Sequence, residues 1–141
     1  MVKKKAFTLI EMAIALLIIG LFLSLVSSRF LSFLAESKLE SQAKIVKALI
    51  ELAMDEAVSG CQSIEITFRK REIHLLKDGK TLMKKLSLDE GMSFEVEEEE
   101  RIKVDEVGSL SGRIPNLIQG DRKVTFRVEN PLLGTISYEL K

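Results

Sequence analysis

The sequence is poor in the residues that form disulfides and most metal centres. Among its 141 residues there is one cysteine, Cys61, and one histidine, His74. A single cysteine cannot form a disulfide within the chain, and a single histidine does not supply the set of ligands that a typical zinc site needs. We therefore expect neither an intramolecular disulfide nor a metal centre.

An excess of charge of one sign is also missing. Lys and Arg total 21, as do Asp and Glu, so no broad positive field is present to neutralise nucleic-acid phosphates. From Glu36 onward, acidic residues outnumber basic ones. A glycine-rich phosphate loop between a strand and a helix is missing as well. We expect no nucleic-acid partner and no cofactor.

A long apolar run near the start of the chain is the main feature of the sequence. Residues 7–28 contain one charged side chain, and they are long enough to cross a hydrocarbon core of roughly 30 Å as a helix. Lys3, Lys4 and Lys5 precede the run, whereas only Arg29 closely follows it. The positive-inside rule then places the N-terminus in the cytoplasm. The sequence predicts a single membrane span with the remainder outside the cytoplasm.

The one charge inside the run is Glu11. An ionised Glu in an apolar helix costs about 2.5–3.5 kcal/mol on insertion scales, so it usually has a polar partner. A cut after Ala6 would create a positive amine on Phe7, close enough in sequence for Glu11 of the same or a neighbouring helix to pair with it. The pattern predicts a processed subunit that assembles with other helices.

The stretch KKKAFTLIE at residues 3–11 resembles the signal of type IV prepilins. The resemblance implies that a prepilin peptidase in the inner membrane cleaves between Ala6 and Phe7 and methylates the new Phe7 amine. Ala6 stands where the family usually has Gly, and we still expect cleavage because the side chain is small. Ser28 stands where major pilins carry Pro, which favours a minor subunit.

The resemblance also implies the partners and the location of the protein. The apolar helix would anchor the chain in the inner membrane, with the head in the periplasm, until an assembly platform protein helps to extract it. The subunit would join other pilins or pseudopilins in a type II secretion pseudopilus or a type IV pilus, and secreted cargo is a further partner. Glu11 would pair with a neighbouring N-terminal amine and set the register.

Beyond residue 28 apolar side chains recur with helical spacing among charged ones. The stripe consists of Leu39, Ala43, Val46, Ile50, Ala53 and Ala57. Neither Pro nor Gly interrupts residues 21–59, so we predict one helix of about fifty residues, far longer than the usual helix, ended by Gly60 in a left-handed conformation. The stripe predicts that residues 29–60 pack on a head, with a short coiled coil as the alternative.

After Gly60 the apolar spacing changes to two, which is typical of strands. We predict strands near residues 64–68, 73–75, 80–88, 92–96 and 102–107, a loop at 108–120 with at most a short strand at Arg113 and Ile114, and a hairpin of 123–129 and 134–140 with a turn at Asn130 and Pro131. The Asp78-Gly79 pair favours a two-residue hairpin. We expect the strands to follow one another as a meander.

These predictions give an α+β, pilin-like fold in which a long N-terminal helix packs on an antiparallel β-sheet head. The expected parts are a leader at 1–6, a transmembrane helix at 7–28, an amphipathic helix at 29–60 and the head at 61–141. The spacing in the head is similar to that of H-type minor pseudopilins and related minor type IV pilins.

The head offers few residues for chemistry. His74 lies in a predicted strand with no nucleophile in a recognisable setting, and Cys61 is expected to be an unreactive thiol. The acidic run of Glu95 and residues 97–100 is more typical of a solvated edge or turn than of a cation site. We expect no catalytic residue and no enzyme activity.

Other interpretations remain open at this stage. The first segment could be an ordinary secretory signal cut near residues 26–28, or a plain uncleaved anchor. The head could be an extracytoplasmic enzyme or binding domain that the helix only tethers. A minor pilin for DNA uptake is a further alternative, which the acidic head disfavours.

Overall fold

The computed structural model describes residues 8–130 and 135–141, apart from the side chain of Ser28. The chain divides into two compact units, Met1–Glu36 and Ser37–Lys141. Helix α1 (Leu9–Gly60), which has 52 residues, contributes to both units. The prediction of one uninterrupted helix is therefore confirmed over this range.

In the first unit, α1 exposes its apolar side chains. The large apolar residues between Leu9 and Leu34 are 38% to 91% exposed. An 18-residue window of α1 has a mean hydropathy of 2.7, and α1 is the one helix in the described part of the chain that is long and apolar enough to span a membrane. Since nothing described in this unit covers these side chains, their burial requires lipid or other helices.

In the second unit, the opposite pattern holds for α1. The side chains of the predicted stripe are all 0% exposed, which confirms the expected core face: Leu39, Ala43, Val46, Ile50, Ala53 and Ala57. Three of these residues are alanines, whose small side chains let the helix approach the strands closely. On the solvent side, Glu40 and Lys44 form an i,i+4 ion pair at 2.9 Å.

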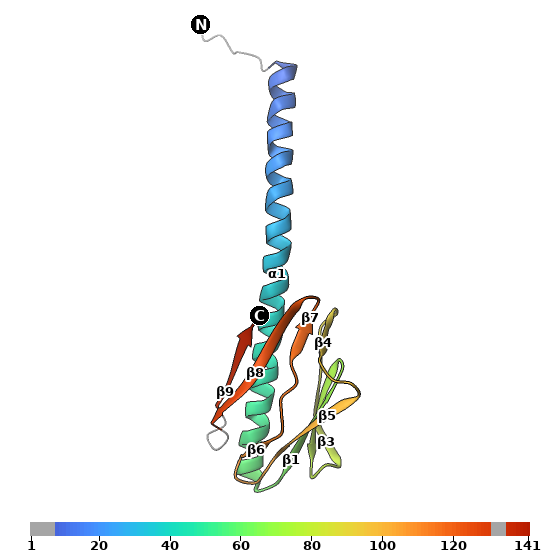
Figure 1. Cartoon of the computed structure of the whole chain (residues 1–141), viewed down its shortest axis with the longest axis vertical. Coiled ribbons are helices and arrows are strands. Elements are labelled where there is room, and N and C mark those ends of the chain that lie inside the picture. The colour runs from blue at the N-terminus through green and yellow to red at the C-terminus, as the bar shows by residue number, and fades with distance from the viewer. Residues whose placement is uncertain (1–7, 131–134) are drawn as a thin grey trace. The chain divides into compact units, whose positions relative to one another are not determined.

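The strands of the second unit form two antiparallel sheets (Figure 1). In chain order they are β1 (Ile64–Arg69), β2 (Glu72–Lys77), β3 (Thr81–Ser87), β4 (Met92–Phe94), β5 (Glu99–Val104), β6 (Leu110–Ser111), β7 (Leu117–Gln119), β8 (Arg122–Asn130) and β9 (Thr135–Leu140). The five-stranded sheet has the order β3-β2-β1-β5-β6, and the four-stranded sheet has the order β4-β7-β8-β9.

The alternation along the strands sets which side chains enter the core. On β1, Ile64, Ile66 and Phe68 are fully buried, and on β5 Ile102 and Val104 are fully buried. An edge-to-face ring contact joins the two sheets, because Phe68 of β1 and Phe94 of β4 have ring centroids 5.2 Å apart. The helix stripe and both sheets thus share one hydrophobic core.

The predicted meander is wrong beyond β3. The sequence β1-β2-β3 is a meander, but β4 leaves this sheet and β5 returns to pair with β1, with Ile66 opposite Ile102. Strand β4 pairs instead with β7, with Phe94 opposite Leu117, and beyond its end Glu95 N–H donates to Asn116 O (2.8 Å). Period-two spacing marks a strand but not its partner.

The predicted loop at 108–120 is also partly wrong. It contains the short strands β6 and β7, whereas Arg113 and Ile114 lie outside both. Ile114 is nevertheless 3% exposed, so the core anchors this connection by a side chain rather than by strand pairing. Val96 lies beyond the end of β4, and Val107 lies in a turn beyond β5 with 70% of its surface exposed. Short strands defined by distant partners carry little local signal.

The two predicted hairpins are present, but the first connection is longer than the predicted two residues, because Lys77 lies opposite Thr81. Strands β2 and β3 are joined at Asp78 and Gly79, which both have positive φ angles of 52° and 67°. Strands β8 and β9 pair from Val124 opposite Leu140 to Asn130 opposite Thr135. The expected turn at Asn130 and Pro131 falls largely on residues outside the described part of the chain.

Candidate functional site

The start of α1 holds Glu11 by a reciprocal set of hydrogen bonds with Thr8. The backbone N–H and the hydroxyl of Thr8 both donate to Glu11 Oε2 at 2.9 Å. In return, Glu11 N–H donates to Thr8 Oγ1 at 3.3 Å. This arrangement is a capping box, in which a Thr before the helix and a Glu three residues later satisfy each other's backbone donors.

Thr8 is a hydrogen-bond partner of Glu11 that the sequence prediction missed. The pattern Thr-x-x-Glu before an apolar run is a helix-start signal, and residues 8–11 contain it. Its presence also explains why α1 begins at Leu9. The capping box gives Glu11 a local structural role in addition to any role toward other chains.

The hydrogen bonds from Thr8 leave the second carboxylate oxygen of Glu11 open to a further partner. Both Thr8 donors converge on Oε2, and no described residue donates a hydrogen bond to Oε1. Neutral donors stabilise the negative charge, as does the positive end of the helix dipole, but they do not neutralise it. An incoming cation could therefore approach Oε1 while Thr8 holds the side chain in position.

The other predicted site residues at this end lie outside the described residues. These are Lys3, Lys4 and Lys5 of the leader and the predicted cleavage pair Ala6 and Phe7. Cleavage after Ala6 and methylation of Phe7 stay predictions. What the structure provides is the beginning of the helix immediately after them.

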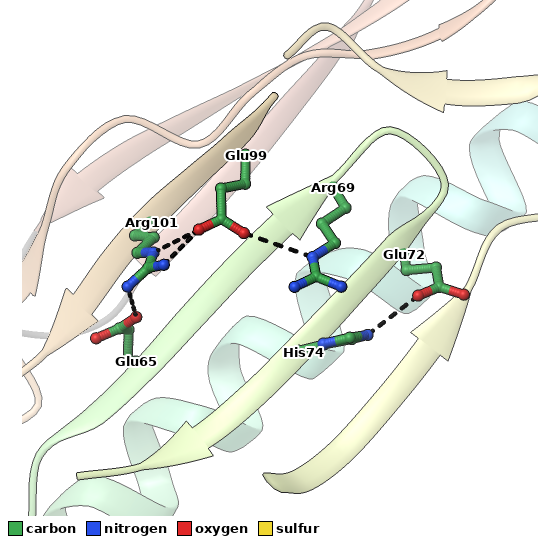
Figure 2. A network of polar contacts seen from close by, with 6 residues as sticks. All are labelled: Glu65, Arg69, Glu72, His74, Glu99 and Arg101. Carbon is green, nitrogen blue, oxygen red and sulfur yellow. Dashed lines mark hydrogen bonds and ion pairs between the residues drawn. The ribbon is translucent and has the colours of Figure 1, made fainter. Parts of the chain in front are cut away.

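The head carries a second polar cluster on the face of the five-stranded sheet (Figure 2). Arg101 of β5 binds Glu99 and reaches Glu65 of β1 at 3.3 Å, and Arg69 lies 3.5 Å from Glu99. The Arg101 guanidinium, with Arg69 as a smaller contribution, lowers the pKa of the Glu99 carboxyl. The Arg101–Glu65 and Arg69–Glu99 pairs cross between the neighbouring strands β1 and β5, whereas Arg101 and Glu99 both lie on β5.

His74 belongs to a second group of pairs in the same cluster. Its Nε2 lies 3.1 Å from Glu72 Oε2 (Figure 2). Lys85 of β3 lies 2.7 Å from Glu72 Oε1. The Lys85 ammonium is the main cause of a lowered pKa of the Glu72 carboxyl. His74 lies on β2, in agreement with the predicted strand; its side chain is 16% exposed and has a partner in the ion-pair cluster.

The acidic run separates into paired and unpaired carboxylates. Glu95 accepts hydrogen bonds from Asn116 Nδ2 at 2.6 Å and Lys123 Nζ at 2.7 Å. Lys123, followed by Asn116, lowers the pKa of the Glu95 carboxyl. Within the described residues, no group of three or more His, Cys, Asp or Glu side chains could hold a metal ion.

Cys61 occupies an unexpected position at the end of α1. The left-handed residue is Cys61, with a φ of 45°, and Gly60 remains helical. Gln62 N–H donates to Ala57 O at 3.1 Å and Cys61 N–H donates to Val58 O at 3.3 Å, the two bonds of a Schellman motif. The predicted cap at Gly60 is therefore wrong by one residue, and Cys61 is exposed.

Comparison with known proteins identifies the start of the chain. Residues 1–27 match the family described as the prokaryotic N-terminal methylation motif. No curated protein and no solved structure matches the chain. The matched residues include the leader, the predicted cleavage pair, Thr8 and Glu11, and they continue into the apolar part of α1. The chain thus carries, at residues 1–27, the N-terminal methylation signal of type IV pilins and pseudopilins, ahead of an α+β fold with a pilin-like layout.

Proposed function

We propose that the protein is a minor pilin or pseudopilin, a structural subunit of a type II secretion pseudopilus or a type IV pilus. The match of residues 1–27 to the N-terminal methylation motif is the observation that carries this proposal. In this proposal the prepilin peptidase cuts between Ala6 and Phe7, and the new amine is methylated. The apolar part of α1 then anchors the subunit in the inner membrane, with the head in the periplasm.

The capping box supports a specific role for Glu11 in assembly. Thr8 holds one carboxylate oxygen and leaves the other available, so the side chain is positioned before a neighbour arrives. Pairing with the N-terminal amine of a neighbouring subunit would then fix the axial register. Such a pair inside an apolar helix bundle selects geometry more than it adds stability.

The head has a structural role in this proposal, without catalysis. Its histidine is held by Glu72 in the ion-pair cluster on the sheet face (Figure 2). The partners of the head are other pilins or pseudopilins, the assembly platform protein and secreted cargo. The exposed apolar residues of the first unit supply the surface through which α1 packs with sister helices.

Mass analysis of the N-terminus tests the proposal directly. The full-length protein is isolated from membranes of a host that has a prepilin peptidase, and the expected first residue is Phe7 with a methylated amine. An Ala6→Phe variant is expected to retain the leader because the bulky side chain does not fit the peptidase cleft. A chain that starts at Met1, or one cut near Arg29, refutes the proposed processing.

A further inference from the structure

The outer strand of the five-stranded sheet is an exposed surface of mixed apolar and basic character. Strand β3 is at one edge of this sheet, and Leu82 and Met83 are 53% and 40% exposed. Lys80 and Lys84 form no ion pair with any residue that the structure describes, whereas Lys85 binds Glu72. We call residues 80–85 the basic edge.

The basic edge is poorly suited to extending the sheet with another strand. Its pairing with β2 shifts register between Leu75 and Leu76, and lysines lie along it. Both features are devices that keep edge strands from pairing with other strands. A partner is therefore expected to contact the side chains of the basic edge and not its backbone.

A surface of opposite charge lies elsewhere on the same head. Residues 95–100 line a hollow of about 440 Å³ that contains five carboxylates and Val96. Glu95 and Glu99 are paired with Lys123 and with Arg69 and Arg101. The remaining carboxylates, Glu97, Glu98 and Glu100, form no ion pair within the described residues. We call residues 95–100 the acidic hollow.

Charge complementarity connects these two surfaces. The unpaired carboxylates repel one another within one short segment. The unpaired lysines flank two exposed apolar side chains, Leu82 and Met83, and the acidic hollow is lined by Val96 as well as by carboxylates. Bringing opposite potentials together favours encounter and fixes the orientation of a complex. Both surfaces belong to one chain, so each copy carries the complement of the next.

We propose that the basic edge of one copy docks on the acidic hollow of a second copy. The contact is heterologous, because different surfaces of the two copies meet, and repetition of such a contact generates a ring where the rotation closes and an open helical array where it does not. The inference goes beyond the proposed function, which does not specify the surfaces through which heads meet. It concerns head-to-head contact alone and does not depend on leader processing or on Glu11.

Disulfide trapping in the full-length chain tests this contact. Two versions are expressed together in membranes, both with Cys61→Ser, one with Met83→Cys and the other with Glu97→Cys. Mild oxidation is expected to give a mixed dimer at least several-fold above a control pair of Met83→Cys with Lys103→Cys, since Lys103 is exposed outside both surfaces. Equal yields from the two pairs, or trapping of Met83→Cys only by a different protein, overturn the proposal.

Charge reversal distinguishes a specific contact from random collision. Lys84→Glu added to the Met83→Cys copy is expected to lower the mixed-dimer yield about tenfold, because it places like charges opposite each other. Glu98→Lys in the second copy should then restore at least half of the yield. An unchanged yield with Lys84→Glu alone, or no recovery in the doubly reversed pair, contradicts the inference. Resistance of the head to protease shows that each variant is folded.

Discussion

The two parts of α1 carry similar apolar side chains in opposite surroundings. Leu23 in the first unit is 65% exposed, whereas Leu39 in the second is 0% exposed. The backbone is helical in both places, so the difference lies in what covers the side chains. The second unit supplies its own cover from two sheets, and the first must obtain cover from a membrane or from other helices. One continuous helix thus has a part whose apolar side chains are buried by the head and a part whose apolar side chains need lipid or other helices to bury them.

Glu11→Ala is expected to have the largest effect, and this effect should be limited to assembly through the first unit of α1. In the proposed fibre, removing one member of a buried ion pair costs about 3–5 kcal/mol, which corresponds to a loss of assembly of roughly 100-fold or more. Membrane insertion should be unchanged or slightly favoured, because an apolar helix accepts Ala more readily than Glu. Fibre incorporation and membrane fractionation measure the two effects.

A matched variant separates this effect from a general loss of negative charge. Glu36→Ala removes an acidic residue from the same helix beyond the apolar run, and it should assemble normally. Thr8→Val removes the hydroxyl that holds Glu11 Oε2 and should give an intermediate defect. Normal assembly of Glu11→Ala would contradict the proposed register contact.

Leu39→Ala and Leu23→Ala sharpen the comparison through the same chemical change in the two parts of α1. Leu39 is fully buried, so its truncation should lower the free energy of unfolding of the head by about 2–5 kcal/mol. Leu23→Ala should leave the head unchanged. Tyr138 is the sole tyrosine of a chain without tryptophan and lies on β9, so its fluorescence reports head unfolding in the detergent-solubilised full chain. Equal destabilisation by both variants would contradict the division into two units.

Most of the difference between the two parts of α1 could be predicted from the sequence, because the signals lie in residues close to one another along the chain. The spacing of Leu39, Val46 and Ile50 defined the buried face because helical periodicity places these side chains on one side. The apolar run, its single Glu and the basic leader carried the membrane and processing predictions. Turn residues located the β2–β3 hairpin, since Asp78 and Gly79 adopt positive φ angles.

The failures have a common physical origin in contacts between distant residues. Nothing local to β5 shows that Ile102 pairs with Ile66, and nothing local to β7 shows that Leu117 pairs with Val124. The division into two sheets depends on those pairings. The capping box was different, because Thr8 and Glu11 are three residues apart and the signal could have been recognised. The helix cap differed by one residue, because Cys61 adopts the left-handed conformation although a glycine precedes it.

Cys61→Gly is expected to stabilise the head by about 0.5–1 kcal/mol. A left-handed conformation costs a residue with a Cβ roughly 1–2 kcal/mol, and glycine escapes this cost but loses some of the gain to backbone entropy. Thermal unfolding followed by Tyr138 fluorescence measures the difference. Cys61→Ala keeps a Cβ and should give no comparable gain. Equal stabilities for the Gly and Ala variants would mean that the backbone conformation at this cap is not the source of strain.

Acid sensitivity is expected to give the smallest effect, and it should be confined to the head. Lys123 and Asn116 lower the pKa of Glu95 in the folded protein, so folding is favoured by the ionised carboxyl. This contribution is fully present above the pKa of an unfolded Glu, about 4.3, and is lost as the pH falls through the lower folded value. The difference in Tm between pH 7 and pH 3 should therefore shrink in Glu95→Gln.

Glu97→Gln is the matched control, because Glu97 is exposed and has no ion pair among the described residues. If the two variants show equal pH dependence, the paired carboxylate is not the origin of the acid sensitivity. Since no ion pair lies among the described residues of the first unit, its helix content should stay constant over the same pH range.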